Sequence, residues 1–268
     1  MPSDHLLLTV LGSATPYATV GNPCSGYLVT NGETRVWVDA GSGTLAALQR
    51  HTRLDEIDAI WISHLHADHS ADLLTAYYAL LFADIDLATP IPLYGPPGTA
   101  DRLAHFLTNG PDRSPVESAF TVRALHDGHR AEVGPMTLTS RAVRHGMPAF
   151  AVRVEACGTS LTFSGDTAPC GALTELAAGT DVLLCEAESD RTPTAGPQVH
   201  HTPEDAADTA RAAAARRLIV THVGRFLTPA DATARAGAVL DHDVEYAAPG
   251  ETFVVTGTQN PRGGAVTP

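Results

Sequence analysis

The sequence predicts an α/β (α+β) fold of four layers, an αββα sandwich in which two stacked β-sheets lie between outer helices. Three observations lead to this fold class. Short apolar runs typical of strands alternate with segments whose apolar residues recur at helical spacing. The order of strands followed by helices occurs in both halves of the chain. The 268 residues are 44% hydrophobic and 18% charged, so the chain can bury a large core and lacks the composition of a disordered protein.

The first half of the chain begins with strand-like runs. Asn31 and Gly32 separate the second and third of these runs and are typical of a two-residue hairpin turn. Apolar runs bounded by turn residues predict strands over residues 5–11, 26–30, 34–39, 57–62 and 91–94. Apolar residues at helical spacing predict helices over residues 42–50, 70–83 and 99–107.

The second half is first rich in strands and then alternates. Strands are expected over residues 120–125, 136–142, 150–156, 160–164, 182–185, 218–221 and 252–255. Helices are expected over residues 203–215 and 229–240, the first with Pro203 in its first turn. No repeat or low-complexity linker divides the chain, so we expect one domain over residues 1–256 and a flexible tail over residues 257–268.

Charge and cysteine usage set the expected partners and compartment. The formal charge of −13 argues against a surface that binds nucleic acid, because such surfaces need dense cations. The start, MPSDHLLLTVLG, lacks the basic residues and long apolar region of a signal peptide, and no run reaches the roughly 18 apolar residues of a membrane span. The cysteines are scattered, without a Cys-x-x-Cys pair. We therefore expect a cytoplasmic protein with reduced thiols and no membrane partner.

The strongest functional signal follows the strand expected over residues 57–62 and reads His64-Leu65-His66-Ala67-Asp68-His69. A loop leaving a strand end can point three imidazoles and a carboxylate into one cavity, whereas a helix turns positions i and i+2 apart. Imidazole nitrogen and carboxylate oxygen suit Zn²⁺. The alternative is three exposed histidines on a polar loop.

Three further candidates follow strand-like runs in the same way, namely His145, Asp166 and His222. Each alone is typical of an ordinary loop. Together with the segment over residues 64–69 they complete a chemically sensible set of metal ligands.

This pattern resembles the metallo-β-lactamase superfamily over residues 6–255. The resemblance implies two zinc ions, with Mn²⁺ or iron as alternatives, in a groove at one edge of the sheets of an αββα sandwich. Asp39, at the end of its strand, is similar to the carboxylate that orients ligand histidines in this family. By the resemblance, one ion would be held by His64, His66 and His145, the other by Asp68, His69 and His222, and Asp166 would bridge both.

A second segment, residues 200–207, resembles the branch of the superfamily that contains ribonuclease Z and cyclic phosphodiesterases. His200 is similar to the histidine that gives a proton to the leaving oxygen in that branch, and His201 is the neighbour that could be confused with it. Thr202 is also typical of a helix cap, and the cap would hold the loop that presents His200.

Two departures from the ribonuclease Z pattern narrow the range of candidate substrates. The His-Glu-Ala-Thr stretch of that family reads Cys185-Glu186-Ala187-Glu188 here, which makes Cys185 a buried thiol rather than a nucleophile. The resemblance places a long tRNA-gripping arm between the third and fourth metal motifs, but here only 21 positions (166 − 145) separate them, and a strand pair fills the gap. With the negative charge, this favours a small-molecule substrate over nucleic acid. A homodimer is compatible with the sequence.

The loop over residues 12–16 lacks the spacing of a phosphate-binding loop and is interpreted as a turn. In the family's fold this loop borders the metal groove. Ser13 and Thr15 are therefore candidates for substrate contact.

These features lead to the hypothesis of a dinuclear-zinc phosphodiesterase for a small phosphodiester, with cyclic-nucleotide-like compounds among the candidates. Zinc would lower the pKa of water from 15.7 to about 7. Asp68 would accept a proton from the attacking water, and protonated His200 would give one to the leaving alkoxide. The alternative is a metal-dependent hydrolase of a carboxylic ester, lactone or thioester. A tRNA 3′-processing endonuclease and a mono-iron sulfur dioxygenase are less favoured.

Overall fold

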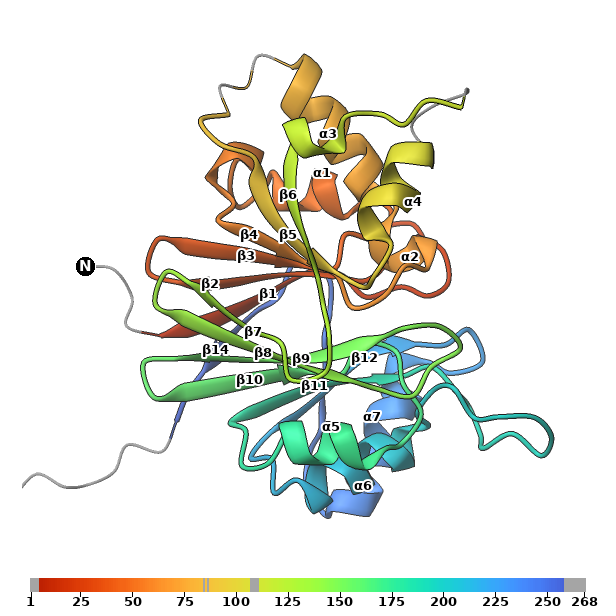
Figure 1. Cartoon of the computed structure of the whole chain (residues 1–268). Helices are drawn as coiled ribbons and strands as arrows, with labels where there is room; N and C mark the ends of the chain where they lie inside the picture. Colours follow the sequence, from red (N-terminus) through yellow and green to blue (C-terminus); the bar gives the residue numbers. More distant parts are fainter. Residues whose placement is uncertain (1–4, 84, 86, 107–110, 258–268) are drawn as a thin grey trace, which may run out of the picture.

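A computed structural model describes residues 5–83, 85, 87–106 and 111–257 and shows two seven-stranded sheets packed face to face (Figure 1). The first sheet has the order β14 (Thr252–Val255), β1 (Leu6–Gly12), β2 (Gly26–Asn31), β3 (Thr34–Val38), β4 (Ala59–Trp61), β5 (Ile91–Gly95) and β6 (Phe120–Ala124). The second has the order β13 (Glu245–Tyr246), β12 (Leu218–Val223), β11 (Val182–Ala187), β10 (Thr159–Phe163), β9 (Phe150–Ala156), β8 (Met136–Ala142) and β7 (Arg130–Val133).

Helices cover the outer face of each sheet and complete the four layers (Figure 1). The first sheet carries α1 (Thr44–Leu48), α2 (Ala67–Ser70), α3 (Asp72–Phe82) and α4 (Thr99–Phe106), with 3₁₀ turns at Leu54–Glu56 and Val116–Ser118. The second sheet carries α5 (Gly171–Leu176), α6 (Pro203–Ala212) and α7 (Pro229–Leu240). The αββα sandwich predicted from the sequence is therefore confirmed.

Burial of apolar side chains holds these layers together. Between the sheets, the ring centroids of Tyr27 and Phe163 lie 5.1 Å apart, and those of Trp61 and Phe163 lie 6.5 Å apart. A second apolar cluster packs α1, α3 and α4 onto the first sheet. A third cluster, rich in alanine, packs α6 and α7 onto the second sheet, where Ala206 and Ala232 are fully buried.

Both sheets combine an antiparallel part with a parallel part. Strands β3 to β6 run parallel in the first sheet, and β10 to β13 run parallel in the second. Ligand sites in such sheets form beyond the carboxyl ends of the parallel strands. The residues at or just after the ends of β3, β4, β10, β11 and β12 include Asp39, His64, Asp166, Glu186 and His222. The topology thus collects the polar residues of both halves at one edge.

The elements expected from the sequence are present, with local differences. The turn of the first hairpin is formed by Gly32 and Glu33 rather than by Asn31 and Gly32, because Asn31 pairs with Thr34 and Gly32 adopts a φ of 60°. The helix expected from residue 70 begins earlier, as α2, and continues as α3. The sequence does not predict β7, α5 or β13, because these elements are short and carry no clear apolar period.

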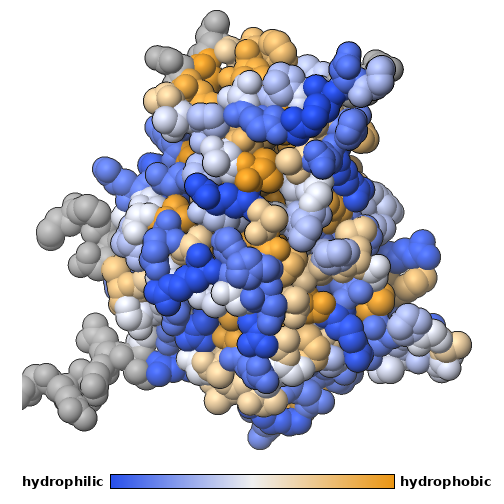
Figure 2. Space-filling model, viewed as in Figure 1, coloured by the Kyte–Doolittle hydropathy of each residue, from blue (hydrophilic) through white to orange (hydrophobic). Residues whose placement is uncertain are grey.

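The surface is mixed in character. On the face drawn in Figure 2, apolar residues gather over α3. Among the described residues, every helix is too short or too polar to cross a membrane. The single domain over residues 1–256 stays a prediction. Of the tail expected over residues 257–268, residues 258–268 lie outside those that the structure describes.

Candidate metal centre

The histidine-rich segment follows β4 and changes conformation halfway. The chain stays extended up to His66, whose ψ is 151°, and then enters α2, which carries Asp68 and His69. The expectation of a loop over the whole segment is therefore wrong for its second part. In the extended part, His64 and His66 lie two positions apart and share a face, and α2 then presents Asp68 and His69 to the second group.

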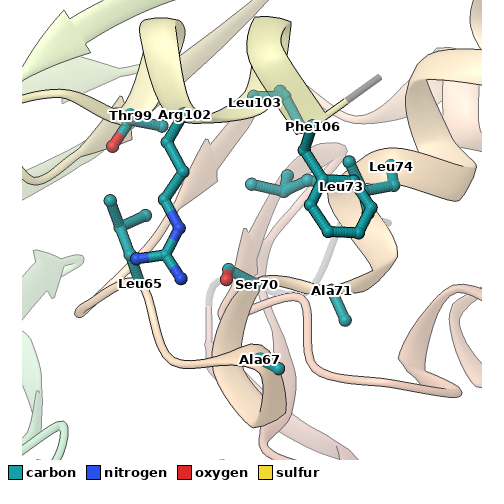
Figure 3. Close-up of a pocket in the computed structure, with 10 residues that line it drawn as sticks. All are labelled: Leu65, Ala67, Ser70, Ala71, Leu73, Leu74, Thr99, Arg102, Leu103 and Phe106. Carbon is teal, nitrogen blue, oxygen red and sulfur yellow. The ribbon is translucent and has the colours of Figure 1, made fainter. Parts of the chain in front are cut away.

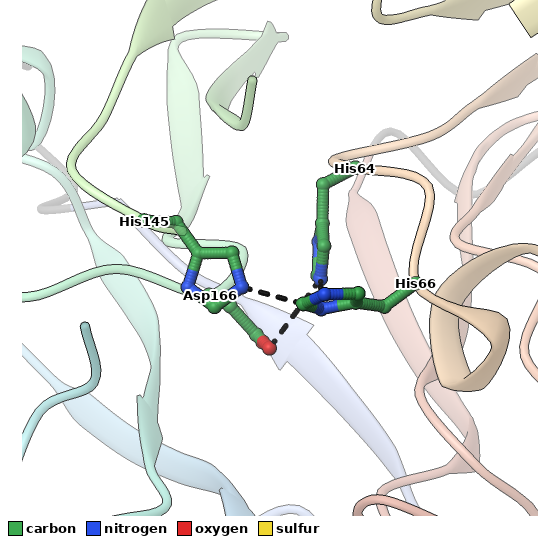
Figure 4. A group of neighbouring side chains, drawn as sticks. All are labelled: His64, His66, His145 and Asp166. Atoms are coloured by element: carbon green, nitrogen blue, oxygen red, sulfur yellow. Dashed lines mark hydrogen bonds and ion pairs between the residues drawn. The ribbon is translucent and has the colours of Figure 1, made fainter. Parts of the chain in front are cut away.

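A first group of potential ligand atoms comes from three separate loops, and its side chains point toward one another in Figure 4. His66 Nδ1 lies 3.0 Å from His64 Nε2 and 3.3 Å from His145 Nε2. Asp166 Oδ2 lies 3.5 Å from His64 Nε2. His64 is buried, whereas His66 and His145 are partly exposed. We call His64, His66 and His145 the open group.

A second group consists of Asp68, His69 and His222, all of which are buried, and we call it the closed group. Asp68 Oδ2 lies 3.8 Å from His69 Nε2 and 3.8 Å from His222 Nε2. Asp166 adjoins this group as well, with Oδ1 3.2 Å from His69 Nε2 and Oδ2 3.4 Å from His222 Nε2. Burial opposes ionisation of Asp166, but the neighbouring His222, His69 and His64 hold the pKa of its carboxyl well below the usual range.

Polar atoms in and beside the closed group are buried without a hydrogen-bond partner among the described residues. They include His69 Nε2, His222 Nε2 and Asp166 Oδ1. Buried polar atoms are normally paired, and each unpaired one requires an explanation. A cation between these nitrogen and oxygen atoms would satisfy them, and the mixture of imidazole and carboxylate is one that Zn²⁺ accepts. The residues present therefore fit a metal site.

Asp39 fixes the orientation of the His69 ring. Its carboxylate accepts hydrogen bonds from His69 Nδ1 at 2.6 Å, from Ser63 N at 2.7 Å and from Ser63 Oγ at 2.8 Å. All three residues are fully buried. Because Nδ1 is occupied by Asp39, His69 turns Nε2 toward the centre, which is the geometry that an orienting carboxylate provides.

The backbone at this edge adopts unusual conformations. Asp39 and His222 have φ values of 56° and 50°, in the left-handed region that residues other than glycine rarely adopt. Gly165, which precedes Asp166, has a φ of 57°, and a Cβ there would lie 2.9 Å from Ser63 Cβ. Glycine therefore lets the Asp166 loop approach the loop that carries His64.

His200 lies beside both groups, on the loop between β11 and α6. Its Nδ1 is 2.9 Å from Glu186 Oε1 and 3.9 Å from Asp166 Oδ2. Burial lowers the pKa of His200, but the charge and hydrogen bond of Glu186, with Asp166 and Glu188, outweigh burial and raise this pKa to about 9. The sequence pattern alone does not single out Glu186. Glu186 lies at the end of an apolar strand, as other residues of the centre do. This position is the sequence signal by which Glu186 could have been identified.

The neighbours of His200 have other partners. His201 is fully buried, with Nδ1 2.6 Å from Thr167 O and Nε2 3.1 Å from Thr209 Oγ1. Thr202 caps α6 by accepting from Asp205 N. Cys185 is buried, and burial raises the pKa of its thiol well above the ordinary value, as for an inert internal cysteine. His200, not His201, therefore reaches the centre.

The loop after β1 contributes one residue to the rim of the centre. Thr15 Oγ1 lies 3.5 Å from Asp68 Oδ2. Ser13 is buried, and its backbone N–H and hydroxyl are engaged by Asn22 and Tyr246. Of the two candidates for substrate contact, only Thr15 is placed near the metal-ligand candidates.

Related chains cover almost the whole sequence. The uncharacterized protein Rv1339 of Mycobacterium tuberculosis is 34% identical over 92% of this chain and 92% of its own length. Ribonuclease Z of Mycobacterium sp. strain KMS is 30% identical over 89% of this chain and 92% of its own length.

Solved structures share the fold at lower identity. The metallo-β-lactamase fold protein YhfI of Bacillus subtilis aligns with a TM-score of 0.80 and 23% identity, covering 92% of this chain and 99% of that one. A diphosphatase from the PhnP family aligns with a TM-score of 0.74 and 21% identity, covering 92% and 97%.

The family model described as Beta-lactamase superfamily domain matches residues 34–223, which include every candidate ligand from His64 to His222. The match agrees with the two-sheet fold and with the histidine and aspartate groups at its edge. These findings indicate a metal-dependent hydrolase. The chain belongs to the metallo-β-lactamase superfamily.

Proposed function

We propose that the protein is a dinuclear-zinc phosphodiesterase that hydrolyses a small phosphodiester, with cyclic nucleotides among the candidate substrates. In this proposal the open group (His64, His66 and His145) would hold one ion, the closed group (Asp68, His69 and His222) would hold the other, and Asp166 would contact both. Mn²⁺ or iron could replace zinc, since the donor atoms suit each of these metals.

When bound, the two ions would supply positive charge that favours ionisation of water and stabilises charge on the phosphoryl oxygens. The chain supplies the proton transfers. Asp68, whose carboxylate lies at the rim beside Thr15, would accept a proton from the attacking water. His200 would donate a proton to the leaving oxygen through Nε2, because Nδ1 is held by Glu186.

The observation that carries this proposal is the His200–Glu186 pair beside Asp166. A leaving alkoxide needs a proton, and a histidine whose pKa is raised to about 9 holds one at neutral pH. The similarity to a protein named ribonuclease Z supports phosphodiester chemistry, and the diphosphatase of similar fold supports a small phosphorus substrate.

We infer that the substrate is small and is not tRNA. Between His145 and Asp166 the chain is taken up mainly by β9 and β10, which leaves no inserted arm in this part of the described structure. The charge of −13 also disfavours a polyanion. All four cysteines have free thiols, which supports the proposal of a cytoplasmic location. A homodimer remains part of the proposal.

Turnover by zinc- and manganese-loaded protein tests the proposal, with an aryl phosphodiester, 2′,3′- and 3′,5′-cyclic nucleotides, a lactone and pre-tRNA as substrates. We expect hydrolysis of the small phosphodiesters. Activity on the lactone alone would establish the carboxylic ester alternative, and cleavage of pre-tRNA would establish a nuclease.

Replacement of His200 tests the acid assignment. His200→Ala should keep its metal content but lose about 10²–10⁴-fold in kcat on diesters with poor leaving groups, and less on p-nitrophenyl esters. The control is His126→Ala, because His126 is an exposed histidine on the loop between β6 and β7. If His200→Ala turns over poor leaving groups at the rate of the unmodified protein, His200 is not the acid.

A further inference from the structure

An apolar cavity of about 120 Å³ lies beside the metal-ligand candidates, between α4 and the junction of α2 with α3. Figure 3 shows Phe106 over Leu73 and Leu74, and Arg102 reaching from α4 toward Leu65 and Ser70. Leucine, alanine and phenylalanine side chains make up most of the wall, so the cavity is suited to an apolar group.

This cavity adjoins the metal centre through the backbone. Leu65, which lines the cavity, stands between His64 and His66 in the open group. Ala67 and Ser70, which also line it, belong to α2, the helix that carries Asp68 and His69. Because side chains alternate along the extended segment, Leu65 faces away from the rings of His64 and His66. The cavity and the open group therefore meet at the exposed edge formed by His66 and Ala67.

Arg102 is the polar group that the cavity offers. The Ser70 hydroxyl donates to His66 O at 2.8 Å, and the Thr99 hydroxyl donates to Pro96 O at 2.7 Å. Within the described part of the chain, the Arg102 side chain forms no hydrogen bond or ion pair, and the residue is exposed. A guanidinium beside apolar walls suits the face or an acceptor atom of an aromatic ring.

We propose that this cavity binds an aromatic group that stays esterified to phosphorus after the leaving alcohol has departed. The proposal rests on the proposed phosphodiesterase function. His200, which protonates the leaving oxygen, comes from the second sheet through the loop between β11 and α6, whereas Leu65 and Arg102 belong to the first-sheet side. The leaving group and the retained group therefore occupy opposite sides of the centre, and the cavity selects the retained one.

Two diesters with the same leaving group isolate this effect, namely phenyl p-nitrophenyl phosphate and methyl p-nitrophenyl phosphate. The zinc-loaded protein should prefer the phenyl ester by about tenfold or more in kcat/KM. Calorimetry with phenylphosphonate and methylphosphonate gives a second readout that needs no turnover. Phenylphosphonate should bind more tightly by a similar factor.

Three variants test whether the preference for the phenyl diester over the methyl diester arises in the cavity. Ala71→Leu fills the cavity at a partly exposed helical position and should abolish the preference for phenyl over methyl. Phe106→Ala removes part of the wall, and Arg102→Gln removes the cation, so each should reduce the preference, Arg102→Gln by about two- to thirtyfold. The matched controls are Phe82→Ala and Arg123→Gln. Phe82 is 71% exposed against 72% for Phe106, and Arg123 is an exposed arginine on β6.

The outcomes separate the subsite from the function. If the protein hydrolyses both diesters with no preference, or if its preference survives in all three variants, the subsite is wrong while the phosphodiesterase proposal stands. If neither diester is hydrolysed, but phenylphosphonate binds preferentially and the variants lose this preference, the subsite stands and the proposed function fails. Equal binding of both phosphonates together with no turnover contradicts both.

Discussion

The open and closed groups contain similar donors but differ in their surroundings. In the open group, His66 and His145 are partly exposed, and His145 Nδ1 is held by a backbone carbonyl, Val199 O, at 3.0 Å. In the closed group every residue is buried, and His69 is held by the Asp39 carboxylate at 2.6 Å. A buried, charge-assisted arrangement is more rigid than one at the surface. We therefore expect the closed group to bind metal more tightly and to release it more slowly to a chelator.

Asp166 joins the two groups, so its loss should have the largest effect. Asp166→Ala removes the oxygen atoms near His64, His69 and His222 and leaves these ring nitrogens without a carboxylate between them. We expect a loss of about 10²–10³-fold in kcat and weaker metal binding in both groups. Metal analysis after dialysis, together with initial rates, checks this. Retention of two ions with full activity would show that Asp166 does not connect the groups.

Of the two groups, Asp39 contacts only the closed one directly, and it reaches the open group through Ser63, whose Oγ lies 3.0 Å from His64 Nδ1. Asp39→Asn should therefore affect one metal more than the other. We expect a loss of about 10–100-fold in affinity for one ion, because the orienting partner of His69 is weakened. Competition with a chromogenic chelator measures the two affinities.

Asp181→Asn is the control for this change. Asp181 is also buried and accepts from Ser160 N at 2.8 Å and from Ser160 Oγ at 3.2 Å, but it lies away from the metal-ligand candidates. Equal losses in both variants would mean that Asp39 acts through stability alone.

Glu186 sets the proton affinity of His200 on the open side. Because the pKa of His200 is raised to about 9, this histidine is protonated below that pH, and kcat for poor leaving groups should fall as the pH rises through about 9. In Glu186→Gln the effect of burial on the pKa of His200 is no longer outweighed by the Glu186 charge. This pKa should drop toward the ordinary histidine value of about 6.5, and the fall in kcat should move to lower pH with it. The pH profile of kcat measures this shift. An unchanged basic limb would remove Glu186 from the proton transfer.

His201 should show the smallest effect on catalysis. Both of its ring nitrogens are bonded inside the protein, to Thr167 O and Thr209 Oγ1. His201→Gln should destabilise the fold by about 1–3 kcal/mol, because buried partners lose their hydrogen bonds, and leave kcat and metal content within about twofold. Thermal unfolding and turnover at low temperature separate the two effects. A large loss of kcat without loss of stability would show that His201, and not His200, donates the proton to the leaving oxygen.

Much of the fold could be predicted because apolar periodicity is visible in the sequence. The strand Thr252–Val255 and the helix Pro229–Leu240 occur with the bounds expected. Short elements escaped prediction because their pattern is too brief. Strand β7, for example, has four residues, of which only Val133 is buried, and is stabilised by its partner β8 rather than by its own apolar face.

The candidate ligands could be named from the sequence because polar residues follow apolar strands at similar positions. The residues that orient these ligands and His200 could not be named from the sequence. Glu186 and Val199 O act through contacts across loops, with His200 and His145 respectively, and such contacts leave no local pattern. The cavity beside Leu65 could not be predicted either, because α4 and the segment of α2 and α3 that form its walls are far apart in sequence and meet only in the fold.

In the proposed enzyme, the open and closed groups hold two metal ions beside Asp166. An anomalous difference map from crystals of the zinc-loaded protein, recorded at the zinc edge, tests this most directly. We expect two peaks about 3.5–4 Å apart, one among His64, His66 and His145 and the other among Asp68, His69 and His222. A single peak, or a peak among Asp166, Glu186 and His200, where a third set of potential donor atoms meets, would contradict it.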